Sequence, residues 1–148
     1  MSPPVDEPEF SFIHIRSGEL ADGGSWVYAW LRADGDRAVV YVGATGMHPA
    51  NRAWLHLHDP NPDIGRVAAR YPESRSEPLD VIAVRLPTDV QRQEVKQAVV
   101  DQLAGRQLLS GGYVGDPPNA QANTRASAAH AARLVSRIVA HLASVKPE

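Results

Sequence analysis

The chain has 148 residues, of which 43% are hydrophobic and 22% are charged, and its formal net charge is -2. These values are typical of one globular domain with its own core, and they argue mildly against a strongly basic nucleic-acid-binding surface. The absence of cysteine excludes disulfides and zinc sites with thiolate ligands. The sequence contains no uninterrupted run of about 18 apolar residues, so it predicts no membrane span. Its acidic start is unlike a signal peptide. We expect a cytoplasmic protein.

Apolar periodicity and turn residues predict alternating strands and helices. The alternation in residues 10–15 (FSFIHI) is typical of a strand at a sheet edge. The turn at Asp34-Gly35 indicates a hairpin, and Pro49 suits the first turn of a helix. The predicted elements, in chain order, are strands at 10–15, 25–31 and 38–43, helices at 49–58 and 63–71, a strand at 79–86, and helices at 90–104 and 124–145.

The fold class that these elements predict is α/β (α+β). We expect a small, mainly antiparallel sheet of three to four strands, flanked by helices, with an added C-terminal helix. Thr88 or Asp89 should cap the helix at 90–104, and Gly105 should lie just beyond its end. The expected divisions are a disordered tail at 1–9, a domain at 10–123 and an amphipathic helix at 124–148. That helix should pack on the domain through Ala131, Leu134, Val135, Ile138, Val139 and Leu142.

Four polar side chains are expected to meet beside the hairpin. Tyr28 and Tyr41 lie on adjacent predicted strands, and a phenol placed near a cation can accept a proton from attacking water. Arg52 and His56 are four residues apart and therefore share one helix face. A guanidinium can neutralise a phosphate, and an imidazole can orient the phenol or relay its proton. The alternatives are ordinary strand tyrosines and a solvated helix face.

One carboxylate further along the chain is a candidate metal ligand. Glu94 lies at the border of the apolar stripe of the helix at 90–104, which centres on Val95, Val99 and Leu103. A single carboxylate with phosphate and water ligands suits Mg²⁺. The alternative is a surface glutamate. Zinc bound by His48, His56 and His58 is less favoured, because no further ligand has usable spacing.

Taken in this order, the residues resemble the GIY-YIG nuclease family. The resemblance covers about residues 26–123 and implies an endonuclease that acts on nucleic acid, on DNA rather than RNA, with Mg²⁺ (or Mn²⁺) as cofactor. It departs from the family at Trp26-Val27-Tyr28, which lacks the leading glycine, and at Ala44, where many members have a cation. The residues that it implies are Tyr28, Tyr41, Arg52 and His56 in catalysis, Glu94 on the metal, and Gly43 with Asn119 or Asn123 in support.

The C-terminal helix is expected to contact the nucleic-acid backbone. Residues 119–147 contain no Asp or Glu, and their arginines are suited to phosphate contacts: Arg125, Arg133 and Arg137. The arginine-rich composition can equally come from GC-rich coding DNA. Specificity would then come from the insertion at 59–77, the terminal helix, a homodimer partner or a separate targeting protein. The alternative function is a non-catalytic nucleic-acid-binding or protein-interaction domain with the same fold.

Overall fold

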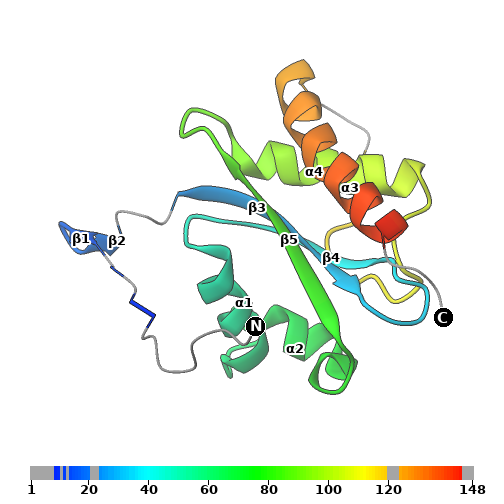
Figure 1. The fold of residues 1–148 in the computed structure, drawn as a ribbon, viewed down its shortest axis with the longest axis horizontal. Coiled ribbons are helices and arrows are strands. Elements are labelled where there is room, and N and C mark those ends of the chain that lie inside the picture. Colours follow the sequence, from blue (N-terminus) through cyan, green and yellow to red (C-terminus); the bar gives the residue numbers. More distant parts are fainter. Residues whose placement is uncertain (1–8, 11, 13, 21–23, 120–123, 145–148) are drawn as a thin grey trace, which may run out of the picture.

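Ten short elements make up the described part of the chain, residues 9–10, 12, 14–20, 24–119 and 124–144 of a computed structural model. In chain order they are β1 (Ile15–Arg16), β2 (Glu19–Leu20), β3 (Ser25–Arg32), β4 (Val39–Thr45), α1 (Pro49–His58), α2 (Arg66–Arg70), a 3-10 turn η1 (Pro72–Arg75), β5 (Leu79–Leu86), α3 (Arg92–Gly105) and α4 (Arg125–Ser144). None of the helices in these ranges is both long and apolar enough to cross a membrane. Figure 1 shows α1 with α2 and α3 with α4 as two separate pairs beside the sheet.

β3 is the middle strand of a three-stranded antiparallel sheet with the order β4-β3-β5. The predicted hairpin is therefore confirmed. Gly35 in its turn has a φ of 70°, which glycine adopts at little cost because it has no Cβ. The three strands begin and end within two residues of the predicted ranges. The predicted class, a small antiparallel sheet with flanking helices, is confirmed at this level.

The predicted edge strand at 10–15 is wrong for its described residues, and residues 11 and 13 lie outside the described part of the chain. Ile15–Arg16 pairs instead with Glu19–Leu20 in a separate two-stranded hairpin. Ser17 and Gly18 between them have φ values of 54° and 79°, the left-handed geometry that a tight hairpin turn requires. This local turn folds the chain back on itself before it can reach the sheet.

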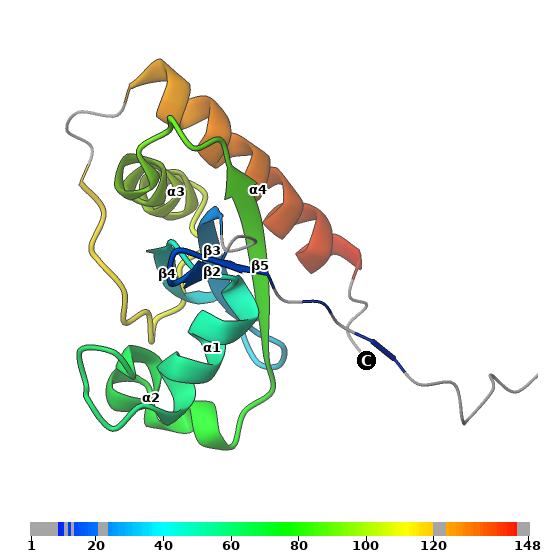
Figure 2. The ribbon, with the colours of Figure 1, turned by 90° about the vertical axis from the view of Figure 1, so that its left-hand side faces the viewer.

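Each side of the sheet is covered by a different pair of helices (Figure 2). Because side chains of a strand alternate, Val27 and Leu31 point to the side of α3 and α4, and Tyr28 and Trp30 point to the side of α1 and α2. We call the first side the valine face and the second the tyrosine face. The valine face therefore holds most of the core, and the tyrosine face holds the tyrosines of the hairpin.

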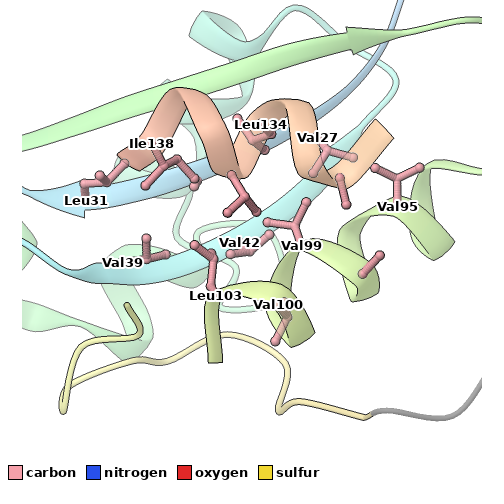
Figure 3. Close-up of a cluster of buried hydrophobic side chains, with 14 of the residues drawn as sticks. Val27, Leu31, Val39, Val42, Val95, Val99, Val100, Leu103, Leu134 and Ile138 are labelled. Atoms are coloured by element: carbon pink, nitrogen blue, oxygen red, sulfur yellow. The ribbon is translucent and has the colours of Figure 1, made fainter. Parts of the chain in front are cut away.

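The core on the valine face is built from branched aliphatic side chains of the sheet, α3 and α4 (Figure 3). Burying one such side chain contributes about 1.5–3 kcal/mol before the entropy cost of ordering the chain is counted. The predicted apolar stripe of α4 is confirmed, because each of its six residues lies in this core or packs against it. The largest fully buried members are Leu31, Leu103, Leu134, Ile138, Val27, Val39, Val42, Val95 and Val99.

The helix boundaries test the predicted capping signals. α1 begins at Pro49 and ends at His58, as predicted, and Nδ1 of His48 accepts a hydrogen bond from the Ala50 amide at 3.1 Å. The predicted cap of α3 is wrong, because Gln91 is the N-cap and makes no side-chain capping bond. The preceding residues form a turn instead, closed by the Val90 amide on the Pro87 carbonyl at 3.1 Å. Gly105, predicted just beyond α3, is its last residue.

Candidate functional site

Tyr28 and His56 form a buried hydrogen-bonded pair at the centre of the tyrosine face. Tyr28 Oη lies 2.6 Å from His56 Nε2, and the two side chains are 2% and 0% exposed. The ring of Tyr41 lies beside both, with its centroid 5.0 Å from that of His56 and 6.3 Å from that of Tyr28. The structure therefore brings three of the predicted site residues together, and a single hydrogen bond links the strand residue to the helix residue.

Gly43 makes room for this pair. In the register of β3 and β4, Gly43 is directly opposite Tyr28, on the same side of the sheet. A Cβ on Gly43 would lie less than 3.0 Å from Oη and Cζ of that tyrosine. Only glycine lets the phenol lie flat over the neighbouring strand and reach His56. Gly43, which the family resemblance implies as a supporting residue, therefore has a steric reason to be glycine.

Arg52 is the fourth predicted residue that lies at this site. It is half-buried on α1, and its Nη1 donates to the carbonyl of Ile64 at 2.9 Å. Its guanidinium is close enough to the phenol of Tyr28 to interact with it by charge and hydrogen bonding, which counteracts part of the rise in the pKa of Tyr28. The (i, i+4) spacing predicted that Arg52 and His56 share a helix face, and both reach the same tyrosine.

The environment keeps both members of the pair neutral. Burial, and then the nearby phenol of Tyr41, raises the pKa of Tyr28 above its ordinary range. Burial, and then the positive charges of Arg52, Arg66 and Arg70, lowers the pKa of His56 to about 3. At neutral pH the imidazole is therefore unprotonated. In the tautomer with a free Nε2 lone pair, it accepts the hydrogen bond of the phenol.

The low pKa of His56 predicts that the fold loses stability between pH 7 and pH 5. An unfolded histidine titrates near 6.5, so the unfolded chain binds more protons than the folded one throughout this window, and stability rises with pH. From the lowered pKa we expect a loss of about 2 kcal/mol in the free energy of unfolding at pH 5 relative to pH 7. Denaturant unfolding at the two pH values measures it.

The matched variants for this test are His56→Gln and His58→Gln. His58 lies on the same helix but is exposed, so its replacement should keep the pH dependence. His56→Gln should remove most of it. The carboxyl groups with lowered pKa values, on Asp36, Glu77 and Asp116, lose their contributions only at lower pH than this window. A pH dependence that survives in His56→Gln contradicts the prediction.

Two further arginines lie beside the phenols, and sequence reasoning did not find them. The predicted helix at 63–71 is confirmed over Arg66–Arg70, and the charges of both end residues lower the pKa of His56. Hydrogen bonding to the phenol of Tyr41 raises the pKa of Arg66. Nη1 of Arg70 donates to the Val114 carbonyl at 3.3 Å. No signal in the local sequence separates them from solubilising charges, because their contacts come from chain segments far away.

The arginines at the site are oriented by backbone carbonyls and not by carboxylates. Arg52 donates to Ile64, Arg70 to Val114, and Nε of Arg66 to the Asp63 carbonyl at 2.7 Å. Within the part of the chain that the structure describes, none of the three guanidinium groups has a carboxylate oxygen within 4.0 Å. Their positive charge is therefore fixed in place and available to an anion.

Glu94 is not brought to this cluster. It is exposed in the first turn of α3, a helix that packs on the valine face through Val95, Ala98 and Val99. Successive residues of a helix are about 100° apart, so Glu94 points about 200° away from Lys96. Lys96 is the residue that faces the site side, where its Nζ lies 2.5 Å from Asp116 Oδ2. Across residues 9–10, 12, 14–20, 24–119 and 124–144, no three His, Asp or Glu side chains are grouped to hold a metal.

The remaining predicted residues that the structure describes lie away from the tyrosine face. The backbone amide of Asn119 donates to Asp101 on α3 at 2.6 Å, and Asn123 lies outside the described residues. Arg125, Arg133 and Arg137 are exposed on α4, which covers the valine face. Their contact with nucleic acid stays a prediction.

No family model matches the chain, and neither a curated protein nor a solved structure is detectably similar to it.

Proposed function

We propose that the protein is an endonuclease that hydrolyses phosphodiester bonds in nucleic acid, DNA rather than RNA, at the cluster on the tyrosine face. One observation carries the proposal: a buried Tyr28–His56 hydrogen bond lies beside three arginines without carboxylate partners. The pair offers proton transfer and the arginines offer charge neutralisation, which are the two requirements of phosphodiester hydrolysis.

Each residue has a distinct role in this reaction. Arg52 neutralises charge that develops on the non-bridging oxygens of the scissile phosphate. Tyr28 takes a proton from the attacking water as its own proton passes to Nε2 of His56, and the imidazolium then gives that proton to the departing 3′ oxygen. The negative phosphate bound at Arg52 offsets the arginine charges that otherwise disfavour this imidazolium. Tyr41, held by Arg66, orients the water or the phosphate from the other side. Burial of both rings keeps this hydrogen bonding free of competing water.

The resemblance implies Mg²⁺ or Mn²⁺ as a cofactor, which would act as a Lewis acid on the phosphate. Glu94, the ligand that the resemblance implies, does not fit this role at the tyrosine face, because its helix packs on the opposite side of the sheet and its side chain is exposed. From α3, the cation Lys96 reaches the edge of the site, where it pairs with Asp116. We therefore derive no step through a metal held by Glu94.

Replacing Glu94 with alanine is expected to leave cleavage near the wild-type rate, because an exposed side chain on the far face touches none of the reacting groups. The measurement is plasmid nicking over a range of Mg²⁺ concentrations, with Glu73→Ala as the control for loss of an exposed carboxylate. Abolished cleavage in Glu94→Ala alone, with an intact fold, would restore the metal role and contradict the absence of Glu94 from the tyrosine face.

A second function is favoured by the burial of the phenols. Tyr28 and Tyr41 are 2% and 4% exposed, so the arginines, and not the hydroxyl groups, are what an approaching strand meets first. A domain that binds nucleic acid through Arg52, Arg66 and Arg70 without cutting it would have the same surface. In that case the tyrosine pair is a packing element of the fold.

One experiment separates the two functions. Plasmid, branched DNA and single-stranded DNA are incubated with the wild type and with Tyr28→Phe, with Mg²⁺ or with chelator. Cleavage by the wild type together with binding but no cleavage by Tyr28→Phe supports the endonuclease. Equal binding without cleavage by either protein supports the binding domain. Absence of both binding and cleavage overturns both and leaves a protein-interaction role.

A further inference from the structure

Asp116 lies among three cations at the edge of the tyrosine face. Its Oδ2 is 2.5 Å from Nζ of Lys96, whose side chain is 15% exposed, against 52% for Asp116. The Lys96 hydrogen bond first, and then the charges of Lys96, Arg70 and Arg66, hold the pKa of Asp116 below its ordinary range. One carboxylate therefore faces three positive groups, and the cluster keeps a net positive charge.

The position of Asp116 does not depend on its own carboxylate. The hydroxyl of Tyr113 donates to the Asp116 carbonyl at 2.6 Å, and Nε2 of Gln97 donates to the Pro117 carbonyl at 3.0 Å. A Cβ on Gly115 would lie less than 3.0 Å from the ring of Tyr113, so only glycine allows this turn. Figure 2 shows the segment after α3 passing close to α2 before it returns toward α4. The backbone places the carboxylate opposite α2.

This cluster adjoins the tyrosine site. Arg66 belongs to both, because it interacts with the phenol of Tyr41 and with the charge of Asp116. Arg70 is held on the Val114 carbonyl, two residues before Asp116. An extended anion at Arg52 and Tyr28 would therefore meet Arg66, Arg70 and Lys96 next. A nucleic-acid strand is such an anion, because it carries a negative charge on every nucleotide.

Resting on the proposed function, we infer that Arg66, Arg70 and Lys96 bind the phosphate next to the scissile one. Asp116 is ion-paired with Lys96 at the edge of this subsite until the backbone phosphate displaces it from that lysine. A phosphate makes the same charge-assisted hydrogen bonds as a carboxylate and offers more acceptor oxygens to the arginine forks. The carboxylate thus acts as a removable counter-ion, which weakens binding of isolated anions and favours a strand that engages both subsites.

The test compares Asp116→Asn with Asp80→Asn. Both replace a carboxylate of similar exposure with a neutral isostere, but the carboxylate of Asp80 contacts the ring of His141 between β5 and α4. Binding of a labelled oligothymidylate of about 12 nucleotides is followed in chelator, so that no cleavage occurs. Because the phosphate displaces Asp116 in the wild type as well, Asp116→Asn adds no phosphate contact. It is expected to bind about tenfold more tightly than wild type with the same log–log salt slope. Asp80→Asn should leave both quantities unchanged.

Lys96→Gln and inorganic pyrophosphate complete the design. Lys96→Gln should weaken oligonucleotide binding, because it removes a cation and leaves Asp116 facing the arginines. Pyrophosphate should raise the thermal midpoint of Asp116→Asn more than that of wild type. If that shift occurs without oligonucleotide binding, the subsite stands and the proposed function fails. If the wild type binds the strand but Asp116→Asn behaves like Asp80→Asn, or if neither anion binds any variant, the inference is overturned.

Discussion

Arg52→Ala should lower the rate of phosphodiester cleavage by about 10²–10³-fold, as happens when one preorganised charge-stabilising donor is removed. The guanidinium is held by the Ile64 carbonyl at 2.9 Å and lies beside Tyr28, so it needs no rearrangement when charge develops on the phosphate. It also opposes the rise in the pKa of that phenol. Its loss therefore weakens charge stabilisation and proton transfer together. Single-turnover plasmid nicking measures the effect.

Two matched variants make the result specific. Arg106→Ala removes the same charge from an exposed position at the end of α3 and should cleave at the wild-type rate. Arg52→Lys keeps the charge but loses the planar fork, and it should fall between the two. Thermal unfolding checks that each variant is folded. Wild-type cleavage by Arg52→Ala would remove this arginine from the mechanism.

Turn residues, proline and apolar periodicity correctly predicted the elements whose formation depends mainly on residues close together in the sequence. Pro49 starts α1, and the apolar stripe of α4 packs on the valine face, because a helix must bury its apolar side. The hairpin followed from β-branched residues around Asp34-Gly35. The strand at 10–15 failed because the turn at 17–18 competes with sheet pairing, and an alternating pattern contains no information about a nearby turn.

The candidate site was predictable only where its residues are related by a short-range rule. Arg52 and His56 are one helical turn apart, and Tyr28 and Tyr41 are on adjacent strands of one hairpin. Arg66 and Arg70 reach the site through the packing of α2, which depends on contacts between distant segments. Position along the chain could not distinguish them from other surface arginines.

Glu94 illustrates how helical phase limits such predictions. The sequence places Glu94 at one border of the apolar stripe of α3. The stripe has two borders, and the sequence does not say which of them faces the site. Packing through Val95, Val99 and Leu103 turns the border with Lys96 toward the site side and the border with Glu94 toward solvent. A difference of two residues amounts to about 200° around the helix, so the choice between a carboxylate and a cation at the site depended on tertiary packing.

Gly43→Ala is the second substitution with a large expected effect, because a single methyl group would lie within 3.0 Å of the Tyr28 phenol. Backbone on one side and His56 on the other leave the ring little room to yield. Overpacking of this kind costs about 1–3 kcal/mol, and a shifted phenol loses its bond to Nε2. We expect a lower free energy of unfolding together with a loss of cleavage close to that of Tyr28→Phe.

Gly105→Ala is the matched control, because a Cβ there has no atom within 4 Å and alanine suits a helix, so stability should be kept or slightly raised. The double variant Gly43→Ala with Tyr28→Phe separates a general loss of structure from displacement of the phenol. If the methyl group acts only by moving the hydroxyl of Tyr28, the double variant should cleave no more slowly than Tyr28→Phe alone, because residues in contact are not additive. Wild-type cleavage by Gly43→Ala would mean that the Tyr28–His56 hydrogen bond is not required, and the proton relay would have to be abandoned.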